Sequence, residues 1–300
     1  MNIVMTGGTS GIGKFALASL AREGARIVLG ARRSGPQNVE TIDLDLARLS
    51  SVRAFASVVH DRLGGNGIDA LILNAGIQSR SIDERTADGF ETTFAVNHLA
   101  HYLLLRLLQP DLAQGATVVL TTSGTHDPEE KTLVPPPRHA RAPLLAHPEV
   151  DPEKDKSPTA AAGRAYSSSK LCNLLTARAF AARPEILARG IGVIAFDPGP
   201  TPGTGLLRNG GPVLAAVWRS FGFLLRPAFS GSNRPETAGR VLSDLARGAI
   251  ERPEGRLYAT LRSGRLSWPE PSLLARRDEV AEALWIDSAE LVGLTDPAIE

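Results

Sequence analysis

The chain contains a single cysteine, Cys172, among its 300 residues. One thiol excludes an internal disulfide framework and suits a reducing compartment, so we expect a cytoplasmic protein. An excess of charge of one sign is also missing, because 33 Lys and Arg face 32 Asp and Glu and the formal net charge is +1. The basic residues are scattered without interleaved aromatic residues, so we expect no nucleic-acid partner.

Long apolar runs and metal-binding clusters are missing as well. No apolar run reaches the roughly 18 residues that a membrane-spanning helix needs, so we expect no stable membrane insertion. An apolar strand begins directly after Met1, so we expect no signal peptide. His98, His101 and His126 have no carboxylate or cysteine partner at ligand spacing, so we expect no metal site.

Hydrophobic residues, 43% of the chain, gather in short runs that alternate with helical patterns. The runs are apolar throughout, which is typical of strands buried on both faces of a sheet. Repeated strand–helix units predict an α/β fold, a doubly wound parallel sheet with helices on both faces and ligands at the carboxyl ends of the strands. We therefore expect a single domain over residues 1–300. The expected strands are 3–5, 26–29, 40–44, 70–73, 118–120, 191–196 and one near 257–258; the expected helices are 11–23, one that ends at 63, 88–112, 164–182 and 235–245.

The segment after the first strand is rich in glycine and reads Thr6-Gly7-Gly8-Thr9-Ser10-Gly11-Ile12-Gly13. A glycine-rich turn between a strand and a helix lets the backbone approach a pyrophosphate. The N-terminus of the helix adds free N–H groups and a partial positive charge. Alone, such a segment can be an ordinary turn, but the strand before it and the helix after it favour a nucleotide site.

Tyr166 and Lys170 lie four residues apart, so on a helix they share one face. A phenol has an ordinary pKa of about 10 and is a poor acid or base at neutral pH. A nearby ammonium group favours the phenolate, so Lys170 can activate Tyr166. In isolation the pair also fits an amphipathic helix with two snorkelling side chains. Together with the nucleotide turn, the pair indicates hydride transfer from a nicotinamide cofactor, with the tyrosine moving the proton.

These segments, in this order, resemble the short-chain dehydrogenase/reductase family. The glycine spacing is the family's T-G-x-x-x-G-x-G, and Asn74-Ala75-Gly76 after the fourth expected strand matches its N-A-G motif. The resemblance implies a Rossmann fold with the strand order 3-2-1-4-5-6-7. It covers nearly the whole chain, but it does not name a substrate.

The same resemblance implies a catalytic set of Ser123, Tyr166, Lys170 and Asn97. Ser123 would bind the substrate oxygen and Tyr166 would move the proton. Lys170 would also hold the nicotinamide ribose, and Asn97 would complete a proton relay through water. Two further hydroxyls rival that of Ser123, those of Thr122 and Thr125.

The second expected strand ends in Leu29-Gly30-Ala31-Arg32-Arg33. NAD-specific sites carry an acidic residue here for the ribose 2′-OH, but by analogy with the family Ala31 occupies that place. Arg32 can bind a 2′-phosphate through its fork of donors, although both arginines could simply be solvated. We therefore expect NADPH (NADP) as the cofactor. The resemblance assigns the rest of the cofactor site to Gly7, Thr9, Ser10, Gly11, Ile12, Gly13, Asp45, Leu46, Asn74, Ala75, Gly76, Tyr166, Lys170, Pro198, Gly199 and Thr204.

Pro198 and Gly199, after the sixth expected strand, match the family's Pro-Gly motif near the nicotinamide, and Thr204 would bind the carboxamide. The gap from this motif to the threonine is wider than in typical members. The wider form resembles the subgroup of retinol dehydrogenase-like and light-dependent protochlorophyllide reductase-like proteins. Four further segments resemble the same subgroup, namely residues 97–102, 123–126, 169–173 and 284–288.

Two irregular stretches interrupt the strand–helix pattern. Residues 124–163 are rich in Pro, Ala, His and charge, and we expect them to form an inserted loop. Residues 200–230 combine Pro and Gly with an apolar patch over 213–225, and we expect a substrate lid there. A subunit contact in a homo-oligomer and a shallow membrane contact are the alternatives for this segment. Long loops are usually functional or disordered, so we expect both stretches at the cofactor edge of the sheet.

The sequence thus predicts an NADPH-dependent oxidoreductase that interconverts a carbonyl and a secondary or primary alcohol on a fairly apolar small molecule. Reduction of a carbon–carbon double bond with NADPH is the second enzymatic hypothesis. A non-catalytic redox sensor that binds NADPH is the third. The complete set of Ser, Tyr, Lys and Asn argues against the sensor, because a sensor needs no proton relay.

Overall fold

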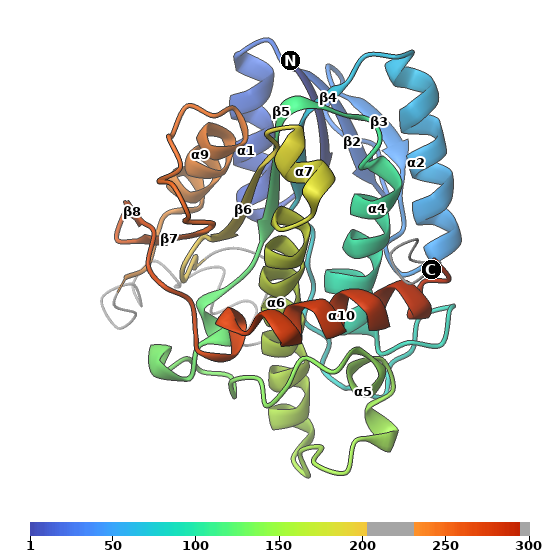
Figure 1. The fold of residues 1–300 in the computed structure, drawn as a ribbon, viewed down its shortest axis with the longest axis vertical. Coiled ribbons are helices and arrows are strands. Elements are labelled where there is room, and N and C mark those ends of the chain that lie inside the picture. Colours follow the sequence, from blue (N-terminus) through green and yellow to red (C-terminus); the bar gives the residue numbers. More distant parts are fainter. Residues whose placement is uncertain (203–230, 295–300) are drawn as a thin grey trace.

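The computed structural model describes residues 1–202 and 231–294. The described strands are β1 (Asn2–Thr6), β2 (Arg26–Ala31), β3 (Glu40–Asp43), β4 (Ile68–Leu73), β5 (Leu112–Thr121), β6 (Gly192–Asp197), β7 (Tyr258–Arg262) and β8 (Arg265–Ser267). They form one sheet in the order β3-β2-β1-β4-β5-β6-β7-β8 (Figure 1). Strands β1 to β7 are parallel, and β8 pairs antiparallel with β7. The expected order 3-2-1-4-5-6-7 is therefore confirmed, with one further strand at the edge.

Helices cover both faces of the sheet, as a doubly wound fold requires (Figure 1). On one face α1 (Gly11–Arg22) packs against α9 (Pro235–Ala246). The other face is covered by α2 (Leu49–Leu63), α4 (Ala100–Leu108) and α6 (Pro158–Ala181). The expected Rossmann architecture is confirmed.

Strand β1 shows why the strands read as continuous apolar runs. Val4 packs into the core shared with α2, α4 and α6, whereas Ile3 and Met5 pack into the core shared with α1 and α9. All three side chains are almost fully buried. Because both faces of the sheet are covered, no alternation of polar and apolar residues develops.

The helix expected over 88–112 is shorter and less regular than the sequence predicts. It runs through α3 (Thr92–Phe94), a π-helical turn η1 (Ala95–Leu99) and α4, and it ends at Leu108. Pro110 follows two residues later, and proline does not continue a helix. Strand β5 then begins at Leu112, well before the expected strand at 118.

The C-terminal segment carries a helix that the sequence pattern does not reveal. Helix α10 (Asp278–Leu291) lies across the outside of α6 (Figure 1). Its Trp285 is buried, with its ring centroid 4.9 Å from that of Tyr102. The guanidinium groups of Arg106 and Arg183 stand 4.9 and 4.7 Å from the indole centroid. Such cation–π packing joins residues that are far apart in the chain, so it leaves no periodic signal in the sequence. Strand β8 and helix α7 (Pro184–Ala188) were likewise not expected.

The stretch 124–163 contains short helices instead of a plain inserted loop. They are η2 (Gly124–His126), η3 (Pro128–Glu130), α5 (Ala142–Ala146) and η4 (Pro148–Val150). Helix α6 also begins inside the stretch, because Ser157 accepts the Ala160 N–H as its N-cap and Pro158 occupies the first helical turn. The segment packs along the N-terminal half of α6, where Ser167 Oγ donates to the Pro135 carbonyl at 2.6 Å.

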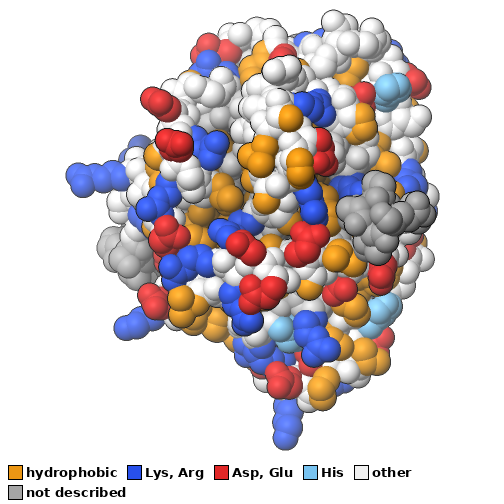
Figure 2. Space-filling model, in the orientation of Figure 1, with side chains coloured by type: hydrophobic (Ala, Val, Ile, Leu, Met, Phe, Trp, Pro, Cys, Tyr) orange, Lys and Arg blue, Asp and Glu red, His pale blue; other side chains and the backbone are white. Residues whose placement is uncertain are grey.

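The surface on the side of α6 and α10 mixes charges of both signs. Figure 2 shows Lys, Arg, Asp and Glu side chains interspersed over this face, together with scattered apolar ones. No helix within the described ranges is long and apolar enough to cross a membrane. The lid expected at 200–230 and its apolar patch fall almost wholly outside the described residues, and Thr204 lies outside them too.

Candidate active site

The glycine turn forms a tight backbone cradle between β1 and α1. Gly7 has a φ of +70°, in the left-handed region that favours glycine. A Cβ on Gly13 would collide with the carbonyl oxygen of Gly7, and a Cβ on Gly7 would lie 2.6 Å from Cα of Ala75. The turn therefore needs glycine at both positions, and its backbone stays open to a close ligand.

The N-terminus of α1 points out of this cradle. Ser10 is the N-cap residue, and within the described residues its side chain makes no capping hydrogen bond. The first N–H groups of the helix are therefore available to an anion. Thr9 and Ser10 are exposed beside them, whereas Ile12 is buried and anchors the helix in the core. This geometry fits the pyrophosphate of a dinucleotide.

Thr6 ties the glycine turn to the end of β4. Its Oγ1 accepts the N–H groups of Asn74 and Ala75, each at 3.1 Å. Because both lone pairs are used, its own proton goes to Nε2 of His101 at 3.0 Å. His101 then donates from Nδ1 to the Asn97 carbonyl at 3.0 Å. Burial lowers the pKa of His101 to about 3, so the imidazole stays neutral.

Asn74, the first residue of the N-A-G motif, joins three strand ends. Its Nδ2 donates to the Gly7 carbonyl at 3.1 Å, and its Oδ1 accepts from Thr121 Oγ1 at 3.1 Å. The motif thereby fixes the glycine turn relative to β5.

The residues expected around the adenosine half of the cofactor follow β2 and β3. Arg32 comes directly after β2, and its side chain is exposed. Asp45 and Leu46 come just after β3 and are half-buried. Asp45 Oδ1 accepts the Ala47 N–H at 3.1 Å, so this carboxylate shapes its own turn. Arg32 and the following Arg33 are both exposed at this end of β2.

Tyr166 and Lys170 share one face of α6, as their spacing predicts. The Lys170 Nζ lies 5.9 Å from the centroid of the Tyr166 ring, and both side chains are buried. Burial raises the pKa of Tyr166, a hydrogen bond with Ser123 lowers it, and the charge of Asp197 raises it. The net direction is opposite to the phenolate-favouring effect expected from Lys170, because burial outweighs the other influences. Tyr166 is therefore held as a neutral phenol.

Lys170 reaches the backbone at the ends of β4 and β5. Its Nζ donates to the Thr121 carbonyl at 3.1 Å. A Cβ on Gly76 would lie 3.2 Å from this Nζ, so the glycine of the N-A-G motif makes room for the ammonium group. Burial lowers the pKa of Lys170 to about 8, and the negative charge of Asp197 acts against this.

Asn97 lies in the π-helical turn η1. Its Oδ1 accepts the Ile77 N–H at 2.8 Å, and its Nδ2 donates to the Ile77 carbonyl at 2.9 Å and to Ser169 Oγ at 3.0 Å. Both amide donors are in use, so the side chain connects the loop after β4 to α6. The main-chain carbonyl of Asn97 is the group that faces His101.

Ser123 follows β5, and its side chain is near enough to the Tyr166 hydroxyl to act on the pKa of that phenol, which it lowers. The rival Thr122 is engaged elsewhere, because its hydroxyl donates to the Lys170 carbonyl at 2.7 Å. The hydroxyl of Thr125 is buried and has no partner among the described residues. Of the three hydroxyls, the geometry favours Ser123 as the one beside Tyr166.

The Pro198-Gly199 pair follows β6 in a turn that contains a left-handed glycine. Gly199 has a φ of +66°, and its N–H donates to Asp197 Oδ1 at 2.9 Å. A Cβ on Gly199 would collide with the Leu261 carbonyl, so the turn requires glycine. Thr201 Oγ1 donates to the Gly199 carbonyl at 2.8 Å.

The sheet register brings all these segments to one edge. Thr6 pairs with Leu73, Leu73 pairs with Leu120, and Thr121 pairs with Phe196. The glycine turn, the N-A-G motif, Ser123 and the Pro-Gly turn therefore leave the sheet side by side, at its carboxyl edge. A phosphate cradle and a buried tyrosine–lysine pair thus stand at the place where doubly wound sheets bind ligands.

Three residues of this edge were given no role in the site from the sequence: His101, which was considered there only as a metal ligand, Asp197 and Arg262. Asp197 is 1% exposed, and Arg262 Nη2 donates to its Oδ2 at 2.7 Å. An acidic residue that ends an apolar strand is a signal for Asp197, because a buried carboxylate needs a partner. The sequence offers no comparable signal for Arg262, since it lies far along the chain.

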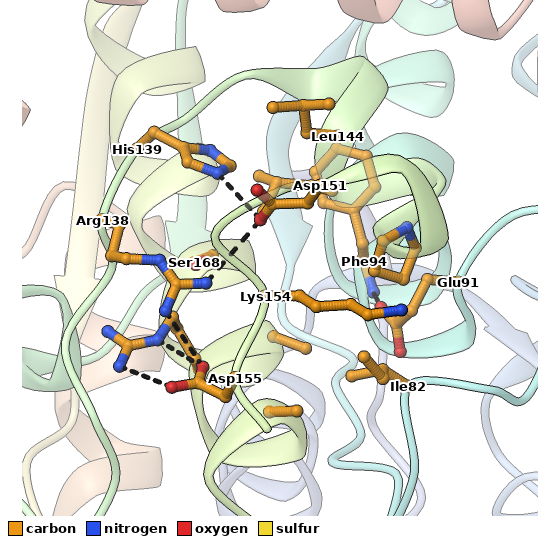
Figure 3. Close-up of a pocket in the computed structure, with 15 residues that line it drawn as sticks. Ile82, Glu91, Phe94, Arg138, His139, Leu144, Asp151, Lys154, Asp155 and Ser168 are labelled. Atoms are coloured by element: carbon orange, nitrogen blue, oxygen red, sulfur yellow. Dashed lines mark hydrogen bonds and ion pairs between the residues drawn. The ribbon is translucent and has the colours of Figure 1, made fainter. Parts of the chain in front are cut away.

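A separate cavity of about 40 Å³ lies beside α6, among the inserted residues (Figure 3). Ser168 lines it, and Ser123, Tyr166 and Lys170 do not. Its Glu91 caps α3 through the N–H groups of Thr93 and Phe94, at 2.9 and 2.7 Å, and burial raises the pKa of Glu91 to about 7. The cavity is therefore separate from the tyrosine–lysine pair at the sheet edge.

Neither a metal cluster nor a reactive thiol stands out in the part of the chain that the structure describes. No group of three His, Cys, Asp or Glu residues there is arranged to hold a metal ion. Cys172 is buried, and burial raises the pKa of its thiol. A protonated, enclosed thiol is a packing residue and not a nucleophile.

Comparison with known proteins agrees with the fold and the motifs. The family model of short chain dehydrogenase matches residues 1–131. The chain is 34% identical to "Dehydrogenase/reductase SDR family member 13" of Bos taurus, over 97% of this chain and 73% of that protein. It is 30% identical to retinol dehydrogenase 12 of Bos taurus, over 97% of this chain and 86% of that protein.

A solved structure shows the same fold. The 3-alpha-hydroxysteroid dehydrogenase from Pseudomonas sp. B-0831, complexed with NADH, superposes with a TM-score of 0.59 at 23% identity, over 87% of this chain and 94% of that one. The similarity to retinol dehydrogenase 12 also supports the subgroup expected from the sequence. The chain therefore belongs to the short-chain dehydrogenase/reductase family and is an NAD(P)-dependent oxidoreductase of carbonyl and alcohol groups.

Proposed function

We propose that this protein uses NADPH to reduce a carbonyl group on a fairly apolar small molecule to an alcohol, with Tyr166 as the proton donor. The observation that carries the proposal is the buried pair of Tyr166 and Lys170 on one face of α6, with Lys170 Nζ 5.9 Å from the centroid of the Tyr166 ring. These groups stand at the same sheet edge as the glycine turn.

The cofactor fits the residues present. The cradle at Gly7 and Gly13 would be filled by any side chain, and the first N–H groups of α1 are available to its pyrophosphate. Arg32 would bind the 2′-phosphate, and Asp45 with Leu46 would contact the adenine. Lys170 would hold the nicotinamide ribose. NADPH supplies the hydride when it is bound.

The proton is the contribution of the chain itself. Because burial raises the pKa of Tyr166, the phenol keeps its proton at neutral pH and can donate it to an oxygen that gains charge. Ser123 would orient that oxygen through its hydroxyl. Burial lowers the pKa of Lys170 to about 8, and its Nζ lies 5.9 Å from the centroid of the Tyr166 ring. Lys170 would therefore return a proton to Tyr166 through a relay that includes Asn97.

The apolar character of the substrate is supported by a relative and by the sequence. Retinol dehydrogenase 12, which is 30% identical to this chain, is named for a lipophilic alcohol. Residues 213–225, just beyond the Pro-Gly motif, are largely apolar. The single cysteine suits a cytoplasmic enzyme, and a homo-oligomer is compatible with the sequence.

A panel of aldehydes and ketones of graded polarity tests the proposal. We expect NADPH to be consumed with at least one apolar carbonyl compound, at a turnover on the order of 1 s⁻¹ or faster. The fall in NADPH absorbance measures the rate, and chromatography identifies the alcohol. Polar sugars serve as the control and should react far more slowly.

Two outcomes would replace this function. If α,β-unsaturated compounds are the substrates and their carbonyl survives in the product, the enzyme reduces a carbon–carbon double bond. If NADPH binds tightly and no compound of the panel is turned over, the chain acts as a cofactor sensor.

A further inference from the structure

Arg262, at the end of β7, links this strand to two other segments that border the candidate site. Its Nη2 donates to Asp197 Oδ2 at 2.7 Å and to Glu130 Oε1 at 2.9 Å. Asp197 ends β6, directly before the Pro-Gly turn, and Glu130 lies in η3, soon after Ser123. One guanidinium group therefore connects the segment that follows β5 to the end of β6.

The guanidinium group also touches the backbone on both sides. A Cβ on Gly124, the residue after Ser123, would lie 2.7 Å from Arg262 Nη2 and 3.0 Å from Asp197 Oδ2. A Cβ on Gly199 would lie 3.1 Å from Arg262 Nη1. Both turns are thus in direct contact with the same ion pair, and each has a glycine at the point of contact.

Asp197 is held from several directions. Its Oδ1 accepts the Gly199 N–H at 2.9 Å, and its Oδ2 accepts from Arg262 and, at 3.4 Å, from the Tyr258 hydroxyl. The side chain of Asp197 is 2% exposed, whereas that of Glu130 is 42% exposed. The ion pair of Arg262 with Asp197 is therefore the stronger one, because solvent screens the ion pair of Arg262 with Glu130.

The charge of Asp197 also reaches the proton-transfer pair. Its negative charge raises the pKa of Tyr166, in the same direction as burial. It also raises the pKa of Lys170, which burial lowers. Four other titratable groups face Asp197 or share its network, namely His126 of η2, Asp127, Glu130 of η3 and Tyr258 of β7. Burial lowers the pKa of His126, so this ring stays neutral above pH 7.

We propose that Asp197 and Arg262 are positioning residues, which hold the Ser123 turn against the Pro198-Gly199 turn and set the electrostatic field at Tyr166 and Lys170. Neither residue needs to touch the substrate for this role. The role rests on the proposed function for its turnover readout, but the field can be measured on the protein alone.

The first experiment follows the titration of Lys170 by NMR. The chain has five lysines, so selective ¹³C labelling gives few signals, and a Lys170→Arg variant assigns the relevant one. Asp197→Asn removes the negative charge and keeps the shape, so the midpoint of Lys170 should fall by about one pH unit. Arg262→Met leaves the carboxylate without its cation, so the midpoint should rise.

Opposite shifts separate a field effect from a merely structural one. The matched control is Asp244→Asn, which removes the carboxylate of the Asp244–Arg247 pair on α9 and should leave the midpoint unchanged. Equal midpoints in all variants, or shifts of the same sign for Asp197→Asn and Arg262→Met, overturn the field part of the proposal. If Asp197→Asn fails to fold, as judged by circular dichroism, the shift of the Lys170 midpoint in Arg262→Met tests the field part of the proposal.

The second experiment separates charge from geometry. Arg262→Lys keeps the positive charge but cannot bridge Asp197 and Glu130 from one planar group. We expect it to retain the Lys170 midpoint and to lose turnover by about 10-fold or more, mainly in kcat. Full turnover in Arg262→Lys overturns the positioning part. If the wild-type protein turns over no carbonyl compound, the proposed function fails, while the NMR titration still decides the field.

Discussion

Replacing Tyr166 with Phe is expected to lower kcat by at least about 100-fold while NADPH still binds, because the change removes the proton donor and almost no volume. Lys170 remains in place to hold the ribose, and the glycine turn is untouched. The ring is buried, so the packing around it keeps its position when the hydroxyl is removed. Initial rates with the best compound of the carbonyl panel measure kcat, and quenching of protein fluorescence measures NADPH affinity.

Tyr102→Phe is the matched control for this experiment. The Tyr102 hydroxyl is also buried and donates to the Trp285 carbonyl at 2.9 Å, below α10. Its loss should cost about 1 kcal/mol of the free energy of unfolding and should leave kcat near the wild-type value. Near-normal turnover in Tyr166→Phe would remove this residue from the mechanism. Equal losses in both variants would mean that the effect is on folding.

The raised pKa of Tyr166 bears on the direction of the reaction. A phenol that keeps its proton is prepared to donate it, as carbonyl reduction requires. Alcohol oxidation instead needs the phenolate, which burial disfavours. The positive charge of Lys170, which falls as pH rises through about 8, is the chain's own means of easing that cost.

The fold could be predicted from the sequence because its signals are local. Apolar runs such as that of β1 mark buried strands, and Gly24 marks the end of the first helix, whereas the stop signal of Pro110 was missed. Helix α10 and strand β8 were missed for the opposite reason. Trp285 is stabilised by arginines that are distant in the chain, and β8 has only three residues.

The candidate site also has features that local sequence signals reveal and features that depend on distant residues. Gly7, Asn74, Tyr166 and Lys170 stand in short motifs whose spacing carries chemical meaning, and the structure places them at one sheet edge. The pKa of Tyr166 could not be predicted from spacing, because burial depends on everything packed around α6. The ion pair of Asp197 and Arg262 joins residues on neighbouring strands that are far apart in the chain, which no motif records.

Arg32→Ala is expected to weaken NADPH binding by roughly 10- to 100-fold and to change NADH binding little, because only NADPH carries the 2′-phosphate. A charge-assisted hydrogen bond is worth about 1.5–3 kcal/mol, which corresponds to that range. Arg32 is exposed directly after β2, one residue beyond Ala31, which occupies the position where NAD-specific sites bind the ribose through an acidic residue. Titration of each cofactor against the same protein sample gives the two dissociation constants.

The neighbouring Arg33→Ala is the control, since it removes the same charge one residue further on, also from an exposed side chain. If only the overall positive charge attracted the phosphate, both variants would lose the same affinity, and high salt would remove the difference between the cofactors. If Arg32 binds the 2′-phosphate through its planar fork, Arg32→Ala should have the larger effect and Arg32→Lys should recover it only in part. The reciprocal variant Ala31→Asp should favour NADH, because a carboxylate there accepts the ribose 2′-OH and repels the 2′-phosphate. If the ratio of the dissociation constants of NADPH and NADH stays constant across these variants, the preference for NADPH does not arise at the end of β2.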